Sequence, residues 1–465
     1  MSNRFRATAA CAVASATLAS FAHSQVITQV VDVGGSPLSQ TPAAGGQFAK
    51  LVGTGFPAVV TGVQVGNNFS PRIISSSATQ IEFVMPAGTG TAKTIQAFFS
   101  GGVSSNQVLI DYQGPSLREI APLSGPTAGG GTITVSGTNF GSNPSVTFGG
   151  AGVIVTFQSD SVIQFQLPPG SGKGIELKVT SGGQSVTTHE FSYSPPFVSS
   201  VAGNGGSTSG GHSITIMGTG FMSGATQVTI GGNPCTLGSV TPSSISCLTP
   251  PGVGLNLPVA VTVGGQPASG TATYSYGAPS VSGSPVPSLV GTAGGQQVTV
   301  TGQNFATVAQ VLVGGIAATN VIAAHTTLKF DAPAGQGLGQ PVVIQTASGS
   351  TQTSIGYLAP LIVTAPNHAI PGSIIQIDGQ NFGQTPAVLF GGLAASVVSK
   401  SSTRLHVVVP NPTSASASIT VFAANQLSNA RLFDFDCIAD LDGNLLVDDA
   451  DFVLFATAYD QLVCY

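Results

Sequence analysis

The chain has 465 residues, more than a single hydrophobic core usually organises, so several domains are expected. Only 6% of the residues are charged, against roughly 25% in ordinary soluble proteins, and the formal net charge is −5. With no cluster of Lys and Arg, this balance excludes a surface built for nucleic acid, so no nucleic-acid partner is expected. Gly (62) and Pro (30) are abundant, yet 42% of the residues are hydrophobic, which is enough apolar material for folded cores.

The first 24 residues have the pattern of an export signal. Arg4 and Arg6 precede an uncharged stretch of small and apolar residues that ends near Ser24. We expect residues 1–24 to be a signal peptide and the mature protein to be secreted, either extracellular or at the cell surface. No later stretch reaches the roughly 18 apolar residues of a membrane span, so no transmembrane segment is expected.

Three sequence markers recur at intervals of about 80 residues. The first is a tetrapeptide of Gly, a polar residue, Gly or Asn, and Phe. The second is a hydrophobic residue followed by Gly-Gly, which is degenerate in the first repeat as Val65-Gly66-Asn67. The third is an alternating strand that ends in Pro, 28 to 30 residues after the tetrapeptide. The tetrapeptides end at Phe56, Phe140, Phe221, Phe305 and Phe382, and the strands end at Pro86, Pro168, Pro250, Pro333 and Pro410.

Within each repeat, short runs rich in Val, Ile, Thr and Phe are separated by Gly, Pro, Asn and Ser, a pattern typical of an antiparallel β-sandwich. A Tyr closes each of the first four repeats, three residues before a Pro that opens the next; the four are Tyr112, Tyr193, Tyr276 and Tyr357. Linkers are therefore nearly absent, which predicts a semi-rigid rod. The recurring Phe and Tyr side chains are interpreted as core anchors.

The clearest resemblance to a known family lies in the second repeat. The run from Pro126 to Gly131 leads into an alternating strand and then into the tetrapeptide that ends at Phe140. This resembles the opening of an IPT/TIG domain, an immunoglobulin-like sandwich. The resemblance covers roughly residues 26–435, and Cys235 and Cys247 match a cysteine pair that is frequent in the family.

The fold expected is all-β, with five tandem immunoglobulin-like (IPT/TIG) sandwiches and a small C-terminal calcium-loop and helix module. The domains are expected at residues 25–114, which are the most divergent, and at 115–195, 196–278, 279–359, 360–435 and 436–465. IPT/TIG domains occur in cell-surface receptors, in some transcription factors and beside polysaccharide-acting enzymes. The fold alone therefore does not fix the function.

Four cysteines remain after the signal peptide, namely Cys235, Cys247, Cys437 and Cys464. An even number in an exported chain predicts disulfides. Four cysteines allow three pairings, of which proximity favours Cys235 with Cys247 and Cys437 with Cys464.

The composition changes near the C-terminus, where eight of the 17 acidic residues follow Phe433 and no Lys or Arg follows Arg431. Residues 440–451 align with a twelve-residue calcium loop, whose ligands are oxygens at fixed positions. The predicted metal ligands are Asp440, Asp442, Asn444, the carbonyl of Leu446, Asp448 and Asp451. Position six is normally Gly, and Leu445 there costs about 1–2 kcal/mol if the left-handed turn is kept. The alternative is an acidic helix start, in which the Asp side chains only cap the helix.

Residues 436–465 resemble a dockerin-type, EF-hand-like module, with residues 451–459 as an amphipathic helix. Typical dockerins carry two such loops and this chain has one. The resemblance therefore implies a calcium-stabilised attachment or cap, with a cohesin-like receptor as one candidate partner.

No catalytic constellation stands out in the sequence. The histidines are dispersed, the acids of the repeats are never paired, and residues 170–173 lack the earlier Gly and the following Ser or Thr of a phosphate loop. We expect a non-enzymatic binding or display scaffold. The scarcity of charge favours a polysaccharide, a surface protein or further copies of the chain as partners.

Two alternatives to the binding scaffold remain open. One is a non-catalytic carbohydrate-binding component of a polysaccharide-degrading system. The absence of Trp and the border positions of most Tyr count against it, because sugars usually stack on exposed aromatic rings. The other is a purely structural stalk.

Overall fold

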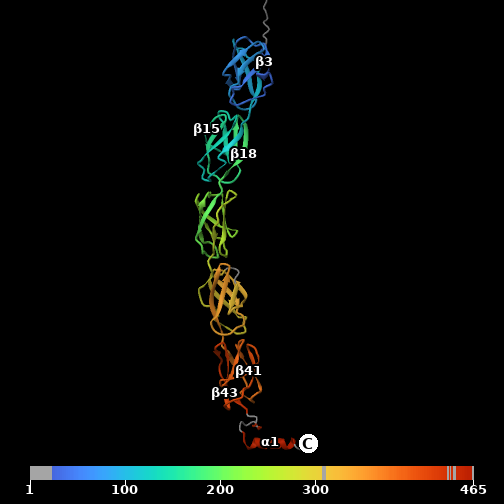
Figure 1. Cartoon of the computed structure of the whole chain (residues 1–465), viewed down its shortest axis with the longest axis vertical. Coiled ribbons are helices and arrows are strands. Elements are labelled where there is room, and N and C mark those ends of the chain that lie inside the picture. The colour runs from blue at the N-terminus through green and yellow to red at the C-terminus, as the bar shows by residue number, and fades with distance from the viewer. Residues whose placement is uncertain (1–23, 306–309, 437–438, 440, 443–446, 463–465) are drawn as a thin grey trace, which may run out of the picture. The chain divides into compact units, whose positions relative to one another are not determined.

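The computed structural model describes residues 24–305, 310–436, 439, 441–442 and 447–462 (Figure 1). Residues 1–23 of the predicted signal peptide, Cys437 and Cys464 lie outside these residues. The chain divides into two compact units, which are described separately. One holds the first two sandwiches and the turn Gly264–Gln266, and the other holds the remaining sandwiches and the C-terminal helix.

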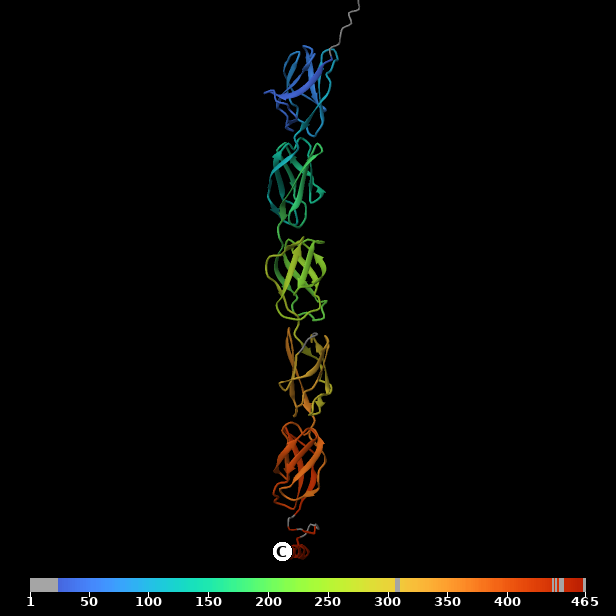
Figure 2. The ribbon, with the colours of Figure 1, turned by 90° about the vertical axis from the view of Figure 1, so that its right-hand side faces the viewer.

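Each sandwich pairs a four-stranded sheet with a second sheet, except the fifth, in which one strand path runs through both layers. Figure 2 shows the strands from a second side. In hydrogen-bonding order, one sheet of the first sandwich is β1 (Val26–Asp32), β3 (Phe48–Thr54), β7 (Gln80–Val84) and β6 (Ile73–Ser76). Its other sheet is β2 (Gln40–Thr41), β9 (Val108–Tyr112), β8 (Lys93–Phe99), β4 (Val60–Val65) and β5 (Asn68–Phe69). In the second sandwich, one sheet is β10 (Ser116–Ala121), β12 (Thr132–Thr138), β16 (Val162–Gln166) and β15 (Val155–Gln158). The other sheet is β11 (Ser124–Gly125), β18 (Gln184–Tyr193), β17 (Ile175–Ser181), β13 (Ser145–Phe148) and β14 (Ala151–Gly152).

The second unit repeats this order of strands. The third sandwich has β19 (Phe197–Ala202), β20 (Ser213–Thr219), β24 (Ser244–Leu248), β23 (Thr236–Val240), and β22 (Asn233–Pro234), β21 (Thr226–Ile230), β25 (Leu257–Val263), β26 (Gln266–Pro267), with β27 (Thr273–Tyr274) on β25. The fourth has β28 (Ser280–Val281), β30 (Gln297–Gln303), β34 (Thr327–Asp331), β33 (Thr319–Ala323), and β29 (Leu289–Val290), β36 (Gly349–Tyr357), β35 (Gln340–Thr346), β31 (Gln310–Val313), β32 (Ile316–Ala317).

In the fifth sandwich a longer strand, β41, pairs with both layers and joins them. Its path is β37 (Leu361–Thr364), β39 (Ile374–Gln380), β42 (Arg404–Val408), β41 (Leu393–Lys400), β40 (Ala387–Phe390), β43 (Ser416–Ala423), β45 (Arg431–Phe435), β38 (His368–Ala369), with β44 (Gln426–Leu427) on β43. One helix follows, α1 (Asp449–Leu462). The expectation of an all-β chain of tandem immunoglobulin-like sandwiches is confirmed.

The alternation read from the sequence sets which side chains enter the cores. Strand β12 buries Ile133 and Val135 while its threonines and serine face outward, as period-two patterning requires. Every tetrapeptide Phe is at most 5% exposed. The first glycine of the tetrapeptide has a steric reason, because a Cβ at Gly137 would lie 2.0 Å from the carbonyl oxygen of Ser116 and 2.5 Å from the Phe140 ring.

The border tyrosines close their sandwiches by hydrogen bonding to the proline that ends the alternating strand. The hydroxyl of Tyr193 donates to the carbonyl of Pro168 at 2.7 Å. The same bond joins Tyr112 to Pro86, Tyr276 to Pro250 and Tyr357 to Pro333. The interpretation of the tyrosines as core anchors is confirmed, and two of the sequence markers prove to be bonded partners.

Candidate functional site

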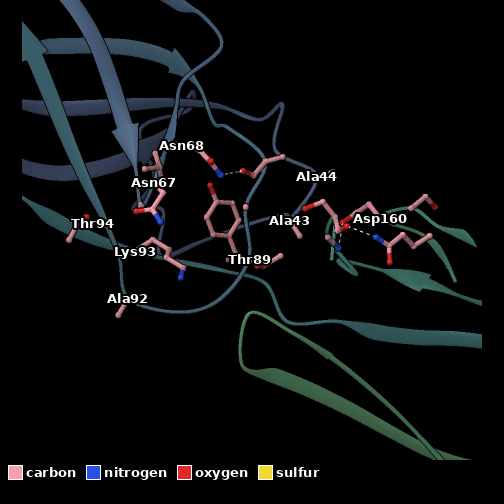
Figure 3. A pocket seen from close by; sticks show the side chains of 18 residues that line it. Ala43, Ala44, Asn67, Asn68, Thr89, Ala92, Lys93, Thr94 and Asp160 are labelled. Carbon is pink, nitrogen blue, oxygen red and sulfur yellow. Dashed lines mark hydrogen bonds between the residues drawn. The ribbon is translucent and has the colours of Figure 1, made fainter. Parts of the chain in front are cut away.

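A polar cleft lies between the first and second sandwiches, both of which belong to the first compact unit (Figure 3). Its volume is about 840 Å³, which falls in the range of ligand sites. The polar lining includes Asn67, Asn68, Thr89, Lys93, Gln158 and Asp160. In Figure 3 the labelled Asn67, Asn68 and Lys93 lie toward the left, Asp160 lies to the right, and Thr89 lies between them.

The cleft residues come from turns and from the strand ends beside them, where side chains are exposed beside a rigid scaffold. Asn67 lies in the turn between β4 and β5, Asn68 begins β5, and Lys93 begins β8. In the second sandwich, Gln158 ends β15 and Asp160 lies in the turn between β15 and β16. The cleft thus combines three loops, one of which is more than 60 residues away from the other two.

Existing hydrogen bonds hold the cleft side chains in place. Asn68 Nδ2 donates to the Ala87 carbonyl at 2.8 Å, and Asp160 Oδ1 accepts from the Gly141 N–H at 3.0 Å. Gln158 Nε2 donates to the Ser142 carbonyl at 2.6 Å. Each bond uses only one of the polar atoms of the side chain, so the remaining oxygen or amide proton can form a hydrogen bond with a ligand.

The charge and aromatic content of the cleft restrict what it can hold. Lys93 and Asp160 are the only charged lining residues, one of each sign. Tyr112 also lines the cleft, but it is 1% exposed, its hydroxyl donates to Pro86, and burial raises its pKa to about 12. The site therefore offers hydrogen bonds to a neutral, hydroxyl-rich ligand and no exposed ring for stacking.

In the C-terminal acidic loop, the Asp451 carboxylate accepts hydrogen bonds from the backbone of the other two predicted calcium ligands with described side-chain positions, Asp442 and Asp448. Asp451 Oδ1 accepts from the N–H groups of Leu441 at 2.6 Å and Asp442 at 3.1 Å, and its Oδ2 accepts from Asp448 N–H at 2.9 Å. These bonds, with that from Asp448 the largest, lower the pKa of Asp451. Asp448 Oδ1 accepts from Ala450 N–H at 2.9 Å, as a helix N-cap does.

In this arrangement the Asp side chains serve the capping role that the alternative interpretation assigned to them. Among the described residues, no three His, Cys, Asp or Glu side chains gather as a metal site. The other predicted ligands, Asp440, Asn444 and Leu446, lie outside the described residues. Calcium binding stays a prediction.

A second cavity, of about 1040 Å³ and largely apolar, lies where the fifth sandwich meets α1. It is lined by Phe435 of β45, by Pro412, and by Phe452 and Phe455 of α1. Phe435 occupies the place of the border tyrosines. Within the described residues, no helix has the length and apolar content of a membrane span.

The predicted cysteine partners Cys235 and Cys247 lie next to each other in the third sandwich, both as thiols. A hydrogen bond between the two sulfurs lowers the pKa of Cys235 and raises that of Cys247. Their disulfide stays a prediction.

Sequence reasoning did not find the cleft. One signal was present, because the degenerate second marker of the first repeat places Asn67 where the other repeats have glycine. That departure falls on the cleft wall.

Comparisons with known proteins find similar chains among proteins of several kinds. Mouse fibrocystin-L is 26% identical over 211 residues, which are 43% of this chain and 5% of that protein, so the chain spans about one-twentieth of the length of that relative. The solved extracellular region of plexin A4 is 16% identical, covers 86% of this chain and 43% of its own, and has a TM-score of 0.21. A surface glycan-binding protein from Prevotella bryantii is 14% identical, with 44% and 54% coverage and a TM-score of 0.27.

A profile of the IPT/TIG domain family matches residues 115–193, 196–276, 283–358 and 363–435. These are the second to fifth sandwiches, and the first sandwich has the same two sheet orders as the second. The matched segments make up more than half of the sequence, and on that ground the chain belongs to the IPT/TIG domain family.

Proposed function

We propose that this protein is an exported, non-enzymatic binding scaffold, extracellular or at the cell surface, whose ligand is a neutral polysaccharide. The polar cleft between the first two sandwiches carries this proposal. Its amides and hydroxyls can exchange hydrogen bonds with sugar hydroxyls, and its single pair of opposite charges does not select a charged ligand. The low charge of the whole chain supports the same class of partner.

The scaffold would bind sugars by hydrogen bonding rather than by ring stacking. All border tyrosines are buried and bonded to backbone, so they present no platform. Hydrogen-bonded recognition through turns gives modest affinity at one site, and a polymer that engages several copies of the protein can raise it. Such a component would serve a polysaccharide-degrading system without catalysing the cleavage.

We further propose that residues 436–465 attach the scaffold to a second protein and that calcium stabilises them. Calcium would be held by Asp442, Asp448 and Asp451 together with the predicted ligands outside the described residues. The ion would stabilise the segment before α1 by binding carboxylate and carbonyl oxygens. The exposed apolar side chains of α1, Phe452, Phe455 and Tyr459, support a protein partner such as a cohesin-like receptor, or self-association.

The test is affinity electrophoresis of the mature chain, residues 25–465, in gels that contain xyloglucan, mixed-linkage β-glucan, galactomannan or dextran. Retardation by at least one polymer is expected. Asn68→Ala and Gln158→Ala should reduce it, whereas Gln227→Ala, which removes an exposed amide from β21 of the third sandwich, should not. Equal retardation of all variants, or none with any polymer, would remove the cleft from the proposal.

A structural stalk is the second candidate, and one observation favours it. In every sandwich the tetrapeptide Phe is buried, and the border tyrosines of the first four are buried too, so the recurrent features serve folding. The stalk predicts no retardation by any polymer, with attachment through residues 436–465 alone.

A further inference from the structure

One side chain joins the two walls of the cleft. Asn139, the third residue of its tetrapeptide, adopts a left-handed backbone with φ of 59° and is 9% exposed. Its Oδ1 accepts from the N–H of Ala43, a cleft-lining residue of the first sandwich, at 3.1 Å. Its Nδ2 donates to Gln113 Oε1, in the junction itself, at 3.3 Å. The amide therefore links the second sandwich to both the first sandwich and the junction.

The same link recurs in the second compact unit. Asn304, with φ of 60°, accepts from Thr208 N–H at 3.2 Å and donates to the Ala278 carbonyl at 3.1 Å. Asn381, with φ of 58°, accepts from Thr292 N–H at 3.3 Å. Three tetrapeptides thus use the left-handed conformation, which Asn tolerates better than most residues, to aim an amide at the preceding sandwich. We call this contact the asparagine clasp.

Close backbone packing accompanies the clasp at the cleft. A Cβ at Gly141 would lie 2.4 Å from Thr89 Cγ2, and one at Gly182 would lie 2.3 Å from the backbone nitrogen of Gly90. These glycines let the two sandwiches approach to contact, so the walls cannot move closer. The clasp opposes their separation.

At the other two clasped junctions a longer side chain crosses the space. His325 of the fourth sandwich occupies the position that Asp160 occupies in the second. In each sandwich the backbone N–H of the tetrapeptide Phe donates to the carbonyl of that residue, from Phe140 to Asp160 and from Phe305 to His325. Its Nδ1 lies 2.9 Å from Thr208 Oγ1 and its Nε2 lies 3.1 Å from Ser207 Oγ.

Gln336 fills the third clasped junction. It lies between two glycines, as Thr89 does in the first sandwich. Its Oε1 accepts from the N–H groups of Gln384 at 2.6 Å and Thr385 at 3.0 Å. Asp160 instead bonds to its own sandwich, and Thr89 reaches the second sandwich only with its methyl group, which packs against Gly141. The junction between the first two sandwiches is clasped but unfilled.

We propose that Asn139 is the positioning residue of the cleft and that Asp160 and Thr89 are the residues that leave it open for a neutral saccharide. This rests on the proposed function for the identity of the ligand. It adds that saccharide binding depends on the asparagine clasp, although the clasp does not contact the sugar. It also adds that the equivalent junctions, where His325 or Gln336 crosses the space, do not bind a saccharide.

The test compares four variants of the mature chain. Asn139→Gly removes the clasp without backbone strain, because glycine accepts a positive φ. Asn139→Asp keeps the acceptor for Ala43 N–H, and Asn381→Gly removes the same clasp elsewhere as the matched control. Asp160→His introduces the side chain that crosses the space at the other junction.

Two readouts separate this inference from the proposed function. The first needs no ligand: hydrogen exchange in the peptide that contains Ala43 should be about tenfold faster in Asn139→Gly, the effect of losing one buried hydrogen bond, and should return toward the original rate in Asn139→Asp. The second is affinity electrophoresis against the four neutral polymers named above. Asn139→Gly and Asp160→His should each weaken the interaction about tenfold or more, and Asn381→Gly should not.

Unchanged exchange at Ala43 in Asn139→Gly overturns the clasp. Faster exchange with undiminished retardation overturns its positioning role. If no polymer retards the parent chain but exchange at Ala43 is faster in Asn139→Gly, the asparagine clasp is supported and the saccharide site is refuted.

Discussion

Replacing Gly170 with alanine tests the corner that closes each sandwich. The ring of Tyr193 lies over Gly170, where an added Cβ would be 2.4 Å from the hydroxyl oxygen and 2.5 Å from Cζ. Gly170 is not among the glycines with positive φ, so alanine can adopt its backbone conformation. The substitution therefore isolates the steric contact with the tyrosine.

The expected destabilisation follows from how the ring is held. Tyr193 is 3% exposed and meets Phe191 edge to face at 5.4 Å, so it cannot swing aside. Overpacking at such a site costs about 1–3 kcal/mol, and loss of the bond to Pro168 adds about 1 kcal/mol. We expect the second sandwich to lose about 2–4 kcal/mol of unfolding free energy.

Hydrogen exchange with mass spectrometry on the mature chain measures this locally, since a chain of several domains does not unfold in one step. Peptides from β16, β17 and β18 should exchange much faster in Gly170→Ala, while the fourth sandwich should not change. Gly131→Ala is the matched control, because a Cβ there meets nothing within 4 Å. If the two variants exchange alike, the corner does not carry the stability assigned to it.

Three further outcomes are expected. Tyr357→Phe should destabilise the fourth sandwich by about 1–2 kcal/mol by leaving the Pro333 carbonyl unpaired, which local hydrogen exchange would show. Backbone N–H groups lower the pKa of Asp451 from 3.8, so its contribution to stability is present above that value and is lost as the pH falls through the folded pKa. Exchange in α1, corrected for intrinsic rates, should therefore rise as the pH falls below 3.8 and stay unchanged in Asp451→Asn. Peptide mapping of the secreted chain without reductant should find Cys235 joined to Cys247, a link worth roughly 3 kcal/mol, and alkylation of both thiols in the unreduced chain would contradict this.

The sequence allowed the sandwiches to be predicted because their determinants are local. Alternation over a few residues sets the faces of β12, and the first glycine of each tetrapeptide is fixed by contacts with its own Phe and the neighbouring strand. The border tyrosines and the strand-ending prolines are separate features of the sequence. The hydrogen bond between them could not be predicted, because 24 to 26 residues separate the partners and neither residue type indicates which partner it binds.

The cleft was not predictable for a related reason. Asn68 and Gln158 are ordinary polar residues at strand ends, and only packing of one sandwich against the next places them around a common space. Asn139 belongs to the recurrent tetrapeptide, but nothing in the sequence indicates that its amide contacts Ala43 of the preceding sandwich. The helix expected over residues 451–459 is present as α1 (Asp449–Leu462), whereas calcium binding by the acidic loop stays a prediction.

Protection of the cleft by bound polysaccharide is the most direct test of the account. The mature chain would be saturated with the neutral polymer that retards it most, and hydrogen exchange would be compared with and without the polymer. The account predicts slower exchange in the segments 65–70, 87–94 and 158–161, with little change in the third to fifth sandwiches. Protection confined to another sandwich, or to residues 447–462, would contradict it.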